Sequence, residues 1–348
     1  DVCSSDLDEC DDRELVPTRI QALNILVTYS RNEALEPIVS ALESPYKEYR
    51  RAALSLSSKL QGEQVLHELK EAYNKYDPRV KAEIIHAFAE RGDVSAIPLI
   101  EAALEHENQT VRKAAIPALT QLAREKAVPG LTGILQSGRP DEVKLAKEAL
   151  MTIAPEHYLP ALTNRYKEFP AESKTAVLEL IGTRQADQYN EMVLQEATGS
   201  VERNIRLTAW QALENIAGPE ALDEVMETFN QTEDDQELDA TGNVIQSMII
   251  RSDNQDTLIT RVLQSMKETS VGKQKEYLNL FPEIGSPSAI GGVMEIYETG
   301  SPELKMAAVQ TLSQWTNTKV LDSLFRVVDR EDSRNIRTTA FDGSLDLI

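Results

Sequence analysis

The sequence is poor in cysteine and in aromatic residues, and it has no long apolar run. Its two cysteines, Cys3 and Cys10, are too few for a disulfide framework or a thiolate metal site. Aromatic residues make up only 5% of the chain, and β-branched clusters are rare, which disfavours a fold built of strands. Because no run of about 18 apolar residues occurs, we expect no segment that spans a membrane.

Positive charge is also scarce. The chain has 36 Lys and Arg against 57 Asp and Glu, a formal net charge of −21. A polyanion of this size repels phosphate backbones and anionic membranes, so we expect neither nucleic acid nor a membrane as partner. The residues that are abundant, Ala, Leu, Glu and Gln, favour helices. The composition therefore predicts an all-α protein.

Catalytic signatures are missing as well. The sequence contains no serine nucleophile elbow, phosphate-cradling glycine loop, zinc-binding helix or dinucleotide fingerprint. We therefore expect a protein that is not an enzyme, with no catalytic residue, no metal site and no cofactor.

A short pattern, apolar-basic-x-x-small or apolar, recurs along the chain and is followed by Leu or Ile at helical spacing. Successive basic residues are 30 to 32 positions apart in the first part of the chain. Asp239 stands where one base is expected, yet the 99 residues from Arg206 to Lys305 still divide into three repeats. The spacing predicts eleven repeats, the first incomplete. The basic positions are Arg19, Arg50, Lys81, Arg112, Lys144, Lys174, Arg206, Lys273 to Lys275, Lys305 and Arg337.

Each repeat is predicted to hold two helices. The second helix carries an apolar stripe at i, i+3, i+4 and i+7, such as Val111, Ala114, Ala115, Ala118, Leu119 and Leu122. Pro98, Pro129 and Pro160, 31 residues apart, mark the start of the first helix, because proline is tolerated in the first turn. One helix pair cannot bury enough apolar surface alone, so the pairs must stack. We therefore predict an all-α, right-handed α-solenoid of about eleven stacked antiparallel helix pairs.

The segments 110–115 and 96–100, with Ala118 and Leu119, resemble the HEAT-repeat family, particularly its short bacterial type. The resemblance extends over residues 14–348, which we expect to form one domain. In this family the recurring base usually bonds an acid of a neighbouring turn, and the acids expected to do so here are Asp77, Asp141, Glu202 and Glu303. Asp239 interrupts this ladder and predicts irregular stacking around residues 230–275.

Three other features have competing interpretations. His67-Glu68 and His106-Glu107 resemble the iron-binding pairs of the HEAT-repeat enzyme deoxyhypusine hydroxylase, but they occupy non-equivalent places, so we expect surface histidines. Trp210 and Trp315 are expected in the core. The acidic stretch 233–239, with residues 252–256, is expected to be a solvated loop, and cation binding there stays open.

A candidate binding surface follows from aligning the repeats. The position five past the base is mostly polar or small, and it would line the inner groove of a solenoid. It is equally consistent with the solvated edge of each helix. The candidate binding residues are Ser55, His86, Glu179, Gln211, Gln310 and Asp342, with Pro117 and Ala149 at the same alignment position.

The leading hypothesis is a monomeric, non-catalytic scaffold whose groove binds a protein or peptide, for which the acidic charge suggests a basic character. The alternative is an auxiliary HEAT segment of a larger secreted bacterial sugar-active enzyme, because residues 284–341 are similar to segments that precede a domain resembling 3-keto-disaccharide hydrolases. That resemblance favours a periplasmic or secreted protein, while a cytoplasmic location stays open. Residues 1–7 look like a translated sequencing adapter. We therefore expect residues 1–13 to be a non-native or disordered leader, and the solenoid to be truncated at both ends.

Overall fold

The computed structural model describes residues 15–30, 33–60 and 62–347, which form helices and their connections without any strand. The chain divides into two compact units, an N-terminal unit of residues 1–177 and a C-terminal unit of residues 178–348. The division falls inside helix α11 (Ala171–Thr183). The leader predicted for residues 1–13 lies outside the described residues.

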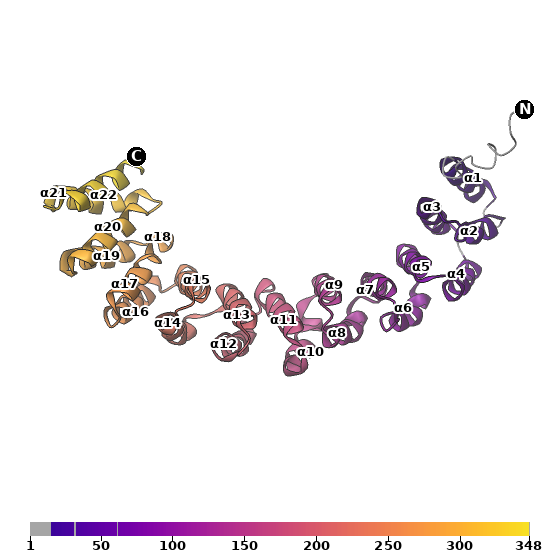
Figure 1. Ribbon diagram of the computed structural model, residues 1–348, viewed down its shortest axis with the longest axis horizontal. Helices are drawn as coiled ribbons and strands as arrows, with labels where there is room; N and C mark the ends of the chain where they lie inside the picture. Colours follow the sequence, from indigo (N-terminus) through magenta and orange to yellow (C-terminus); the bar gives the residue numbers. More distant parts are fainter. Residues whose placement is uncertain (1–14, 31–32, 61, 348) are drawn as a thin grey trace, which may run out of the picture. The chain divides into compact units, whose positions relative to one another are not determined.

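The N-terminal unit is an array of antiparallel helix pairs. In Figure 1 the second helices α3, α5, α7 and α9 form one row and the first helices α2, α4, α6, α8 and α10 form the other. The helices are α1 (Val16–Tyr29), α2 (Leu35–Ala41), α3 (Lys47–Ser57), α4 (Glu63–Lys75), α5 (Pro78–Arg91), α6 (Ile97–Ala103), α7 (Gln109–Ala123), α8 (Val128–Ser137), α9 (Pro140–Leu150) and α10 (Leu159–Asn164).

The C-terminal unit continues the same alternation. Its first helices are α12 (Asn190–Gly199), α14 (Leu222–Gln231), α16 (Gln255–Lys267), α19 (Pro287–Thr299) and α21 (Leu321–Arg330). Its second helices are α13 (Arg203–Ile216), α15 (Asp235–Arg251), the pair α17 (Val271–Leu278) and α18 (Phe281–Ile284), α20 (Pro302–Ser313) and α22 (Arg334–Leu345).

The predicted repeat is confirmed. Within the described part of the chain, ten helix pairs follow the single helix α1, which gives eleven repeats with an incomplete first one. Pro98, Pro129 and Pro160 lie in the first turn of α6, α8 and α10, as predicted. The apolar stripe of α7 is buried, including Val111 and Leu119.

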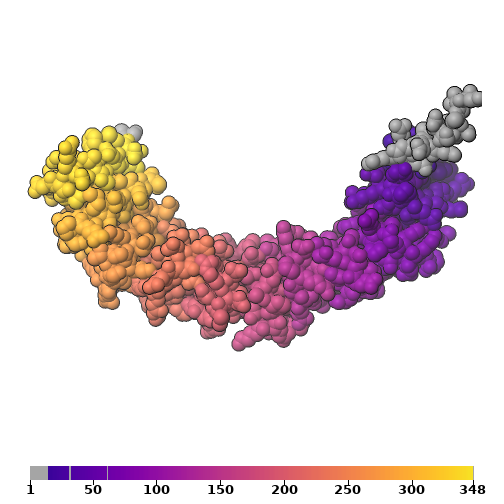
Figure 2. All heavy atoms as spheres, viewed as in Figure 1, coloured from indigo at the N-terminus to yellow at the C-terminus, as the bar shows by residue number. Residues whose placement is uncertain are grey.

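Packing in each unit is between neighbours along the chain. Second helices contact the next second helix, as α5 contacts α7 and α13 contacts α15. In Figure 2 the colours therefore change gradually along each unit. Small residues allow close approach: a Cβ added to Gly182 of α11 would lie 2.8 Å from the Cα of Ala212 in α13.

The irregularity predicted around residues 230–275 is present, but stacking continues through it. Asp239 is exposed on α15, and the second helix of the following repeat is broken between α17 and α18, where Pro282 lies in the first turn of α18. The Lys273 ammonium group on α17 donates to the carbonyls of Phe229 and Thr232, at 2.8 and 3.2 Å. A lysine of the next repeat thus reaches the end of α14, in the repeat where Asp239 replaces the base.

Candidate interaction surface

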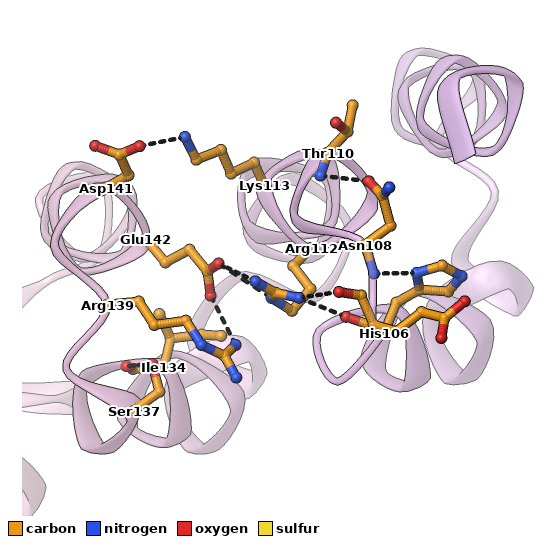
Figure 3. A network of polar contacts seen from close by, with 11 residues as sticks. His106, Asn108, Thr110, Arg112, Lys113, Ile134, Ser137, Arg139, Asp141 and Glu142 are labelled. Carbon is orange, nitrogen blue, oxygen red and sulfur yellow. Dashed lines mark hydrogen bonds and ion pairs between the residues drawn. The ribbon is translucent and has the colours of Figure 1, made fainter.

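Three arginines of the recurring position connect successive repeats. The Nη1 group of Arg112 donates to the carbonyls of His106 and Glu107, at 2.7 and 2.8 Å, in the turn before α7. Its Nε and Nη2 groups donate to Glu142 of α9, at 3.0 and 2.7 Å, which places the guanidinium between two repeats (Figure 3). The arginine thus provides donors for carbonyls of the turn between α6 and α7 and joins its own second helix to the next.

The same arrangement recurs at the other two arginines. Arg50 donates to the Ser44 and Pro45 carbonyls and to Glu83. Arg206 donates to the Ser200 and Val201 carbonyls and to Glu237 at 2.6 Å. The base-to-acid ladder is therefore present in both units, and its acids are Glu83, Glu142 and Glu237.

The prediction that Asp77, Asp141, Glu202 and Glu303 bond the recurring bases is wrong for the first three. Asp77 caps α5 by accepting from the Arg79 N–H at 2.7 Å, and Asp141 pairs with Lys113 at 2.6 Å on the exposed side of α9. Glu202 is at the N-cap of α13, where its side chain accepts no capping bond. Only Glu303 meets a predicted base, Lys275. Glu142 and Glu237 also lie in the first turn of their helices, so the direction in which a side chain leaves its helix, and not its nearness to the helix start, decides which acid meets the guanidinium.

Lysines at the recurring position contact an aromatic ring eight residues earlier. Lys81 lies over the ring of Tyr73 with 5.2 Å from Nζ to the centroid, and Lys174 lies over Tyr166 at 5.5 Å. Lys305 repeats the contact with Tyr297 at 5.8 Å. This cation–π pattern has a sequence signal, an aromatic residue eight positions before each of these lysines, which the sequence reasoning missed. These three lysines, like Arg50, Arg112 and Arg206, are therefore held by structural contacts.

Burial and pairing act in opposite directions on Glu142. Its side chain is fully buried, and burial alone would raise the pKa of its carboxyl. Hydrogen bonds from Arg112 and Arg139 outweigh that effect, and the net result is a lowered pKa. The carboxylate is therefore charged at neutral pH and pairs with two cations, Arg112 on α7 and Arg139 at the N-cap of its own helix α9.

All six candidate binding residues are exposed, on α3, α5, α11, α13, α20 and α22. Pro117 is exposed on α7, but Ala149 is only 7% exposed, and the neighbouring Glu148 takes its place at the surface. The alignment placed Ala149 one residue too late in the repeat. Arg112 lies four residues after Asn108, the N-cap of α7, and the residue four after Arg139, the N-cap of α9, is Val143 and not Lys144. We call Ser55, His86, Glu179, Gln211, Gln310 and Asp342 the surface row.

Two grooves of the N-terminal unit lie along this face. The groove between α3 and α5 has a volume of about 420 Å³ and brings together Ser55, His86 and Glu90. More than a third of His86 is exposed, but desolvation in the groove lowers the pKa of its imidazole, with Glu90 acting in the opposite direction. The groove between α7 and α9 has a volume of about 390 Å³ and includes Pro117 and Ala149. The other members of the surface row lie outside these two grooves.

The structure separates the two His-Glu pairs. His67 is exposed on α4, and His106 follows α6, where its Nδ1 accepts from the Asn108 N–H at 3.0 Å. No group of three or more His, Cys, Asp and Glu side chains able to hold a metal occurs among the residues that the structure describes. None of the described helices is both long and apolar enough to cross a membrane.

The expectation for the tryptophans is confirmed, while that of a loop at the acidic stretch holds only for residues 233–234 and 252–254, which lie between helices. Trp210 and Trp315 are 0% and 2% exposed. Residues 235–239 form the first turns of α15 instead of a loop, and Asp234 caps this helix. Asp234 also binds Arg203 through two hydrogen bonds, at 2.8 and 2.7 Å. Capping and pairing with the preceding repeat stabilise the acids in a helix.

Comparisons with known proteins agree with this architecture. A family model of HEAT repeats matches residues 67–151. No curated protein sequence matches the chain.

The structure of Kap121p is similar to this one, with a TM-score of 0.63, 14% identity, and coverage of 94% of this chain and 43% of Kap121p. The karyopherin Kap121p bound to the extreme C-terminus of the protein phosphatase Cdc14p gives a TM-score of 0.65, 14% identity, and coverage of 96% and 44%. Kap121p bound to the SUMO protease Ulp1p gives a TM-score of 0.62 and 16% identity, with coverage of 94% of this chain and 43% of Kap121p. The chain thus spans less than half the length of these proteins. The family model shows HEAT repeats in residues 67–151, and the structural similarity shows that the chain shares the α-solenoid fold of these proteins.

Proposed function

We propose that this chain is a non-catalytic scaffold that binds a partner protein or peptide along the exposed face of its second helices. The observation that carries the proposal is the surface row, a polar position repeated on the second helices α3, α5, α11, α13, α20 and α22, whose opposite faces are buried. Repeat arrays commonly bind partners over such extended surfaces. Kap121p, which shares the fold, has been solved bound to Pho4p, to the Cdc14p C-terminus and to Ulp1p.

Charge favours a basic partner. The net charge is −21, and the sequence between Arg206 and Arg251 contains ten Asp and Glu residues but no Lys, Arg or His. Arg203, Arg206 and Arg261 pair with Asp234, Glu237 and Asp223 of this segment. The negative potential that remains would attract a cationic segment and repel a polyanion.

A random-peptide selection on the full chain tests the proposal. Selected peptides should bind the wild-type chain, and a triple variant of the surface row should weaken their binding about tenfold or more, since contacts at three anchor positions are lost. The row variant combines Gln211→Ala, Gln310→Ala and Asp342→Asn.

A matched triple variant on the first helices is the control, because it makes the same chemical changes at exposed positions of the same unit. It combines Gln195→Ala on α12, Gln231→Ala on α14 and Asp322→Asn on α21. Affinities measured by fluorescence anisotropy should be unchanged in this control. Failure to enrich any peptide, or equal weakening by the two triples, would contradict the proposal.

A further inference from the structure

We propose that the groove between α7 and α9 is an anchor site for an arginine side chain of the partner. This inference rests on the proposed function and adds to it the chemistry of one contact. The groove lies wholly within the N-terminal unit and is lined by Pro117, Thr120, Gln121, Leu145, Glu148, Ala149 and Thr152.

The walls of the groove are apolar. Pro117 contributes its ring from α7, and Leu145 and Ala149 contribute side chains from α9. Pro117 lies inside α7, where it has no N–H to donate to the Lys113 carbonyl and where its ring disturbs regular helix geometry. A volume of about 390 Å³ has room for a long side chain with a methylene stem.

The two hydroxyl groups of the groove have already used their hydrogens, and the Gln121 amide has used one of its two. The Thr120 hydroxyl donates to the Ile116 carbonyl at 3.0 Å, and the Thr152 hydroxyl donates to the Ala149 carbonyl at 2.7 Å. The Gln121 amide nitrogen donates to the Ala89 carbonyl at 2.9 Å. These contacts leave mainly oxygen acceptors facing the groove, so a ligand must bring donors.

Glu148 gives the groove its negative charge. Its carboxylate is exposed and makes no ion pair with any residue that the structure describes. The nearby cations act on another acid: Lys113 pairs with Asp141 at 2.6 Å, and this contact, aided by the charge of Lys144, lowers the pKa of Asp141. The free carboxylate at the groove is therefore complementary to a cationic group.

An arginine side chain meets these requirements together. Its methylene stem can pack on Pro117 and Leu145, and its planar guanidinium carries five donors for several acceptors at once. A purely aliphatic side chain would cover the oxygen acceptors without replacing their water. An acidic side chain would face the Glu148 carboxylate.

The test is a methyl NMR titration of the full chain with Nα-acetyl-arginine-N-methylamide as probe. We expect saturable shifts of the Leu145 and Ala149 methyl signals, and about tenfold weaker binding in Glu148→Gln, because a charge-assisted contact becomes neutral. The citrulline analogue, which has the same shape without the charge, should give no saturable shift in the wild-type chain.

Glu125→Gln is the matched control, since Glu125 is exposed in the same repeat but does not line this groove. It should bind the probe as the wild-type chain does. The inference is overturned if arginine and citrulline analogues shift Leu145 alike, or if both glutamate variants weaken binding equally. The result is independent of the peptide selection, so peptides could still depend on the surface row while this groove fails to bind arginine.

Discussion

Gly182 illustrates how one atom sets the spacing of second helices in the C-terminal unit. A Cβ at this position would lie 2.8 Å from the Cα of Ala212 and 3.0 Å from its Cβ. A backbone atom cannot move aside without shifting its helix, so close packing here requires glycine. By contrast, a Cβ added to Gly291 on α19 would meet no atom within 4 Å.

We expect Gly182→Ala and Gly291→Ala to change stability in opposite directions. The clash at Gly182 should lower the free energy of unfolding by about 1 to 3 kcal/mol, which outweighs the better helix propensity of alanine. At Gly291 only the propensity acts, and it should raise the free energy of unfolding by about 0.5 to 1 kcal/mol. Urea denaturation followed by circular dichroism measures both. A stabilised Gly182→Ala chain would show that α11 and α13 do not pack this closely.

At the scale of the helix, proline has different effects in the first turn and in the interior. Pro98 lies in the first turn of α6, where its missing N–H has no helical partner. Pro117 lies inside α7, which continues from Gln109 to Ala123 around it. A proline inside a helix loses one backbone hydrogen bond and strains the preceding turn.

Pro117→Ala should therefore raise the free energy of unfolding by about 1 to 3 kcal/mol, whereas Pro98→Ala should change it little. Thermal unfolding of the two variants beside the wild-type chain measures the difference. If Pro117→Ala is destabilised instead, packing of the proline ring against its neighbours contributes more than the restored hydrogen bond.

At the scale of the whole molecule, stability depends on ion pairs that recur along both units. The pKa of the Glu142 carboxyl is lowered, since the Arg112 and Arg139 hydrogen bonds outweigh burial, and that of Asp234 is lowered mainly by Arg203. At the alkaline end, burial and then the hydrogen bond to Glu331 raise the pKa of Tyr297 to about 12.

These shifts predict two limits of stability on the pH scale. The lowered pKa of the Glu142 carboxyl contributes stability that is complete above its pKa in the unfolded chain, 4.5 for glutamate. This contribution is lost as the pH falls through the lower pKa of the folded chain. The raised pKa of Tyr297 contributes stability that is complete below pH 10 and is lost between pH 10 and about 12.

Urea midpoints measured from pH 3 to pH 12 test this prediction, with one variant for each limit. Glu142→Gln should flatten the loss of stability below pH 4.5, and Tyr297→Phe should flatten the loss above pH 10. Neither variant should change the slope at the other limit. An unchanged acid slope in Glu142→Gln would mean that this pair does not contribute to the acid transition.

The sequence by itself determined the all-α class, the eleven repeats, the helix starts at Pro98, Pro129 and Pro160, and the burial of Trp210 and Trp315. All of these depend on local spacing, which helical periodicity converts directly into faces and boundaries.

Only the tertiary structure decided which acid meets each recurring arginine, why Glu148 and not Ala149 is exposed, and which side chains line the grooves. These features depend on the offset between one helix and the next, and on whether a side chain points along its own helix or across to its neighbour. A shift of one residue between neighbouring helices changes which side chains meet and which are exposed. The spacing of the repeats does not specify that shift.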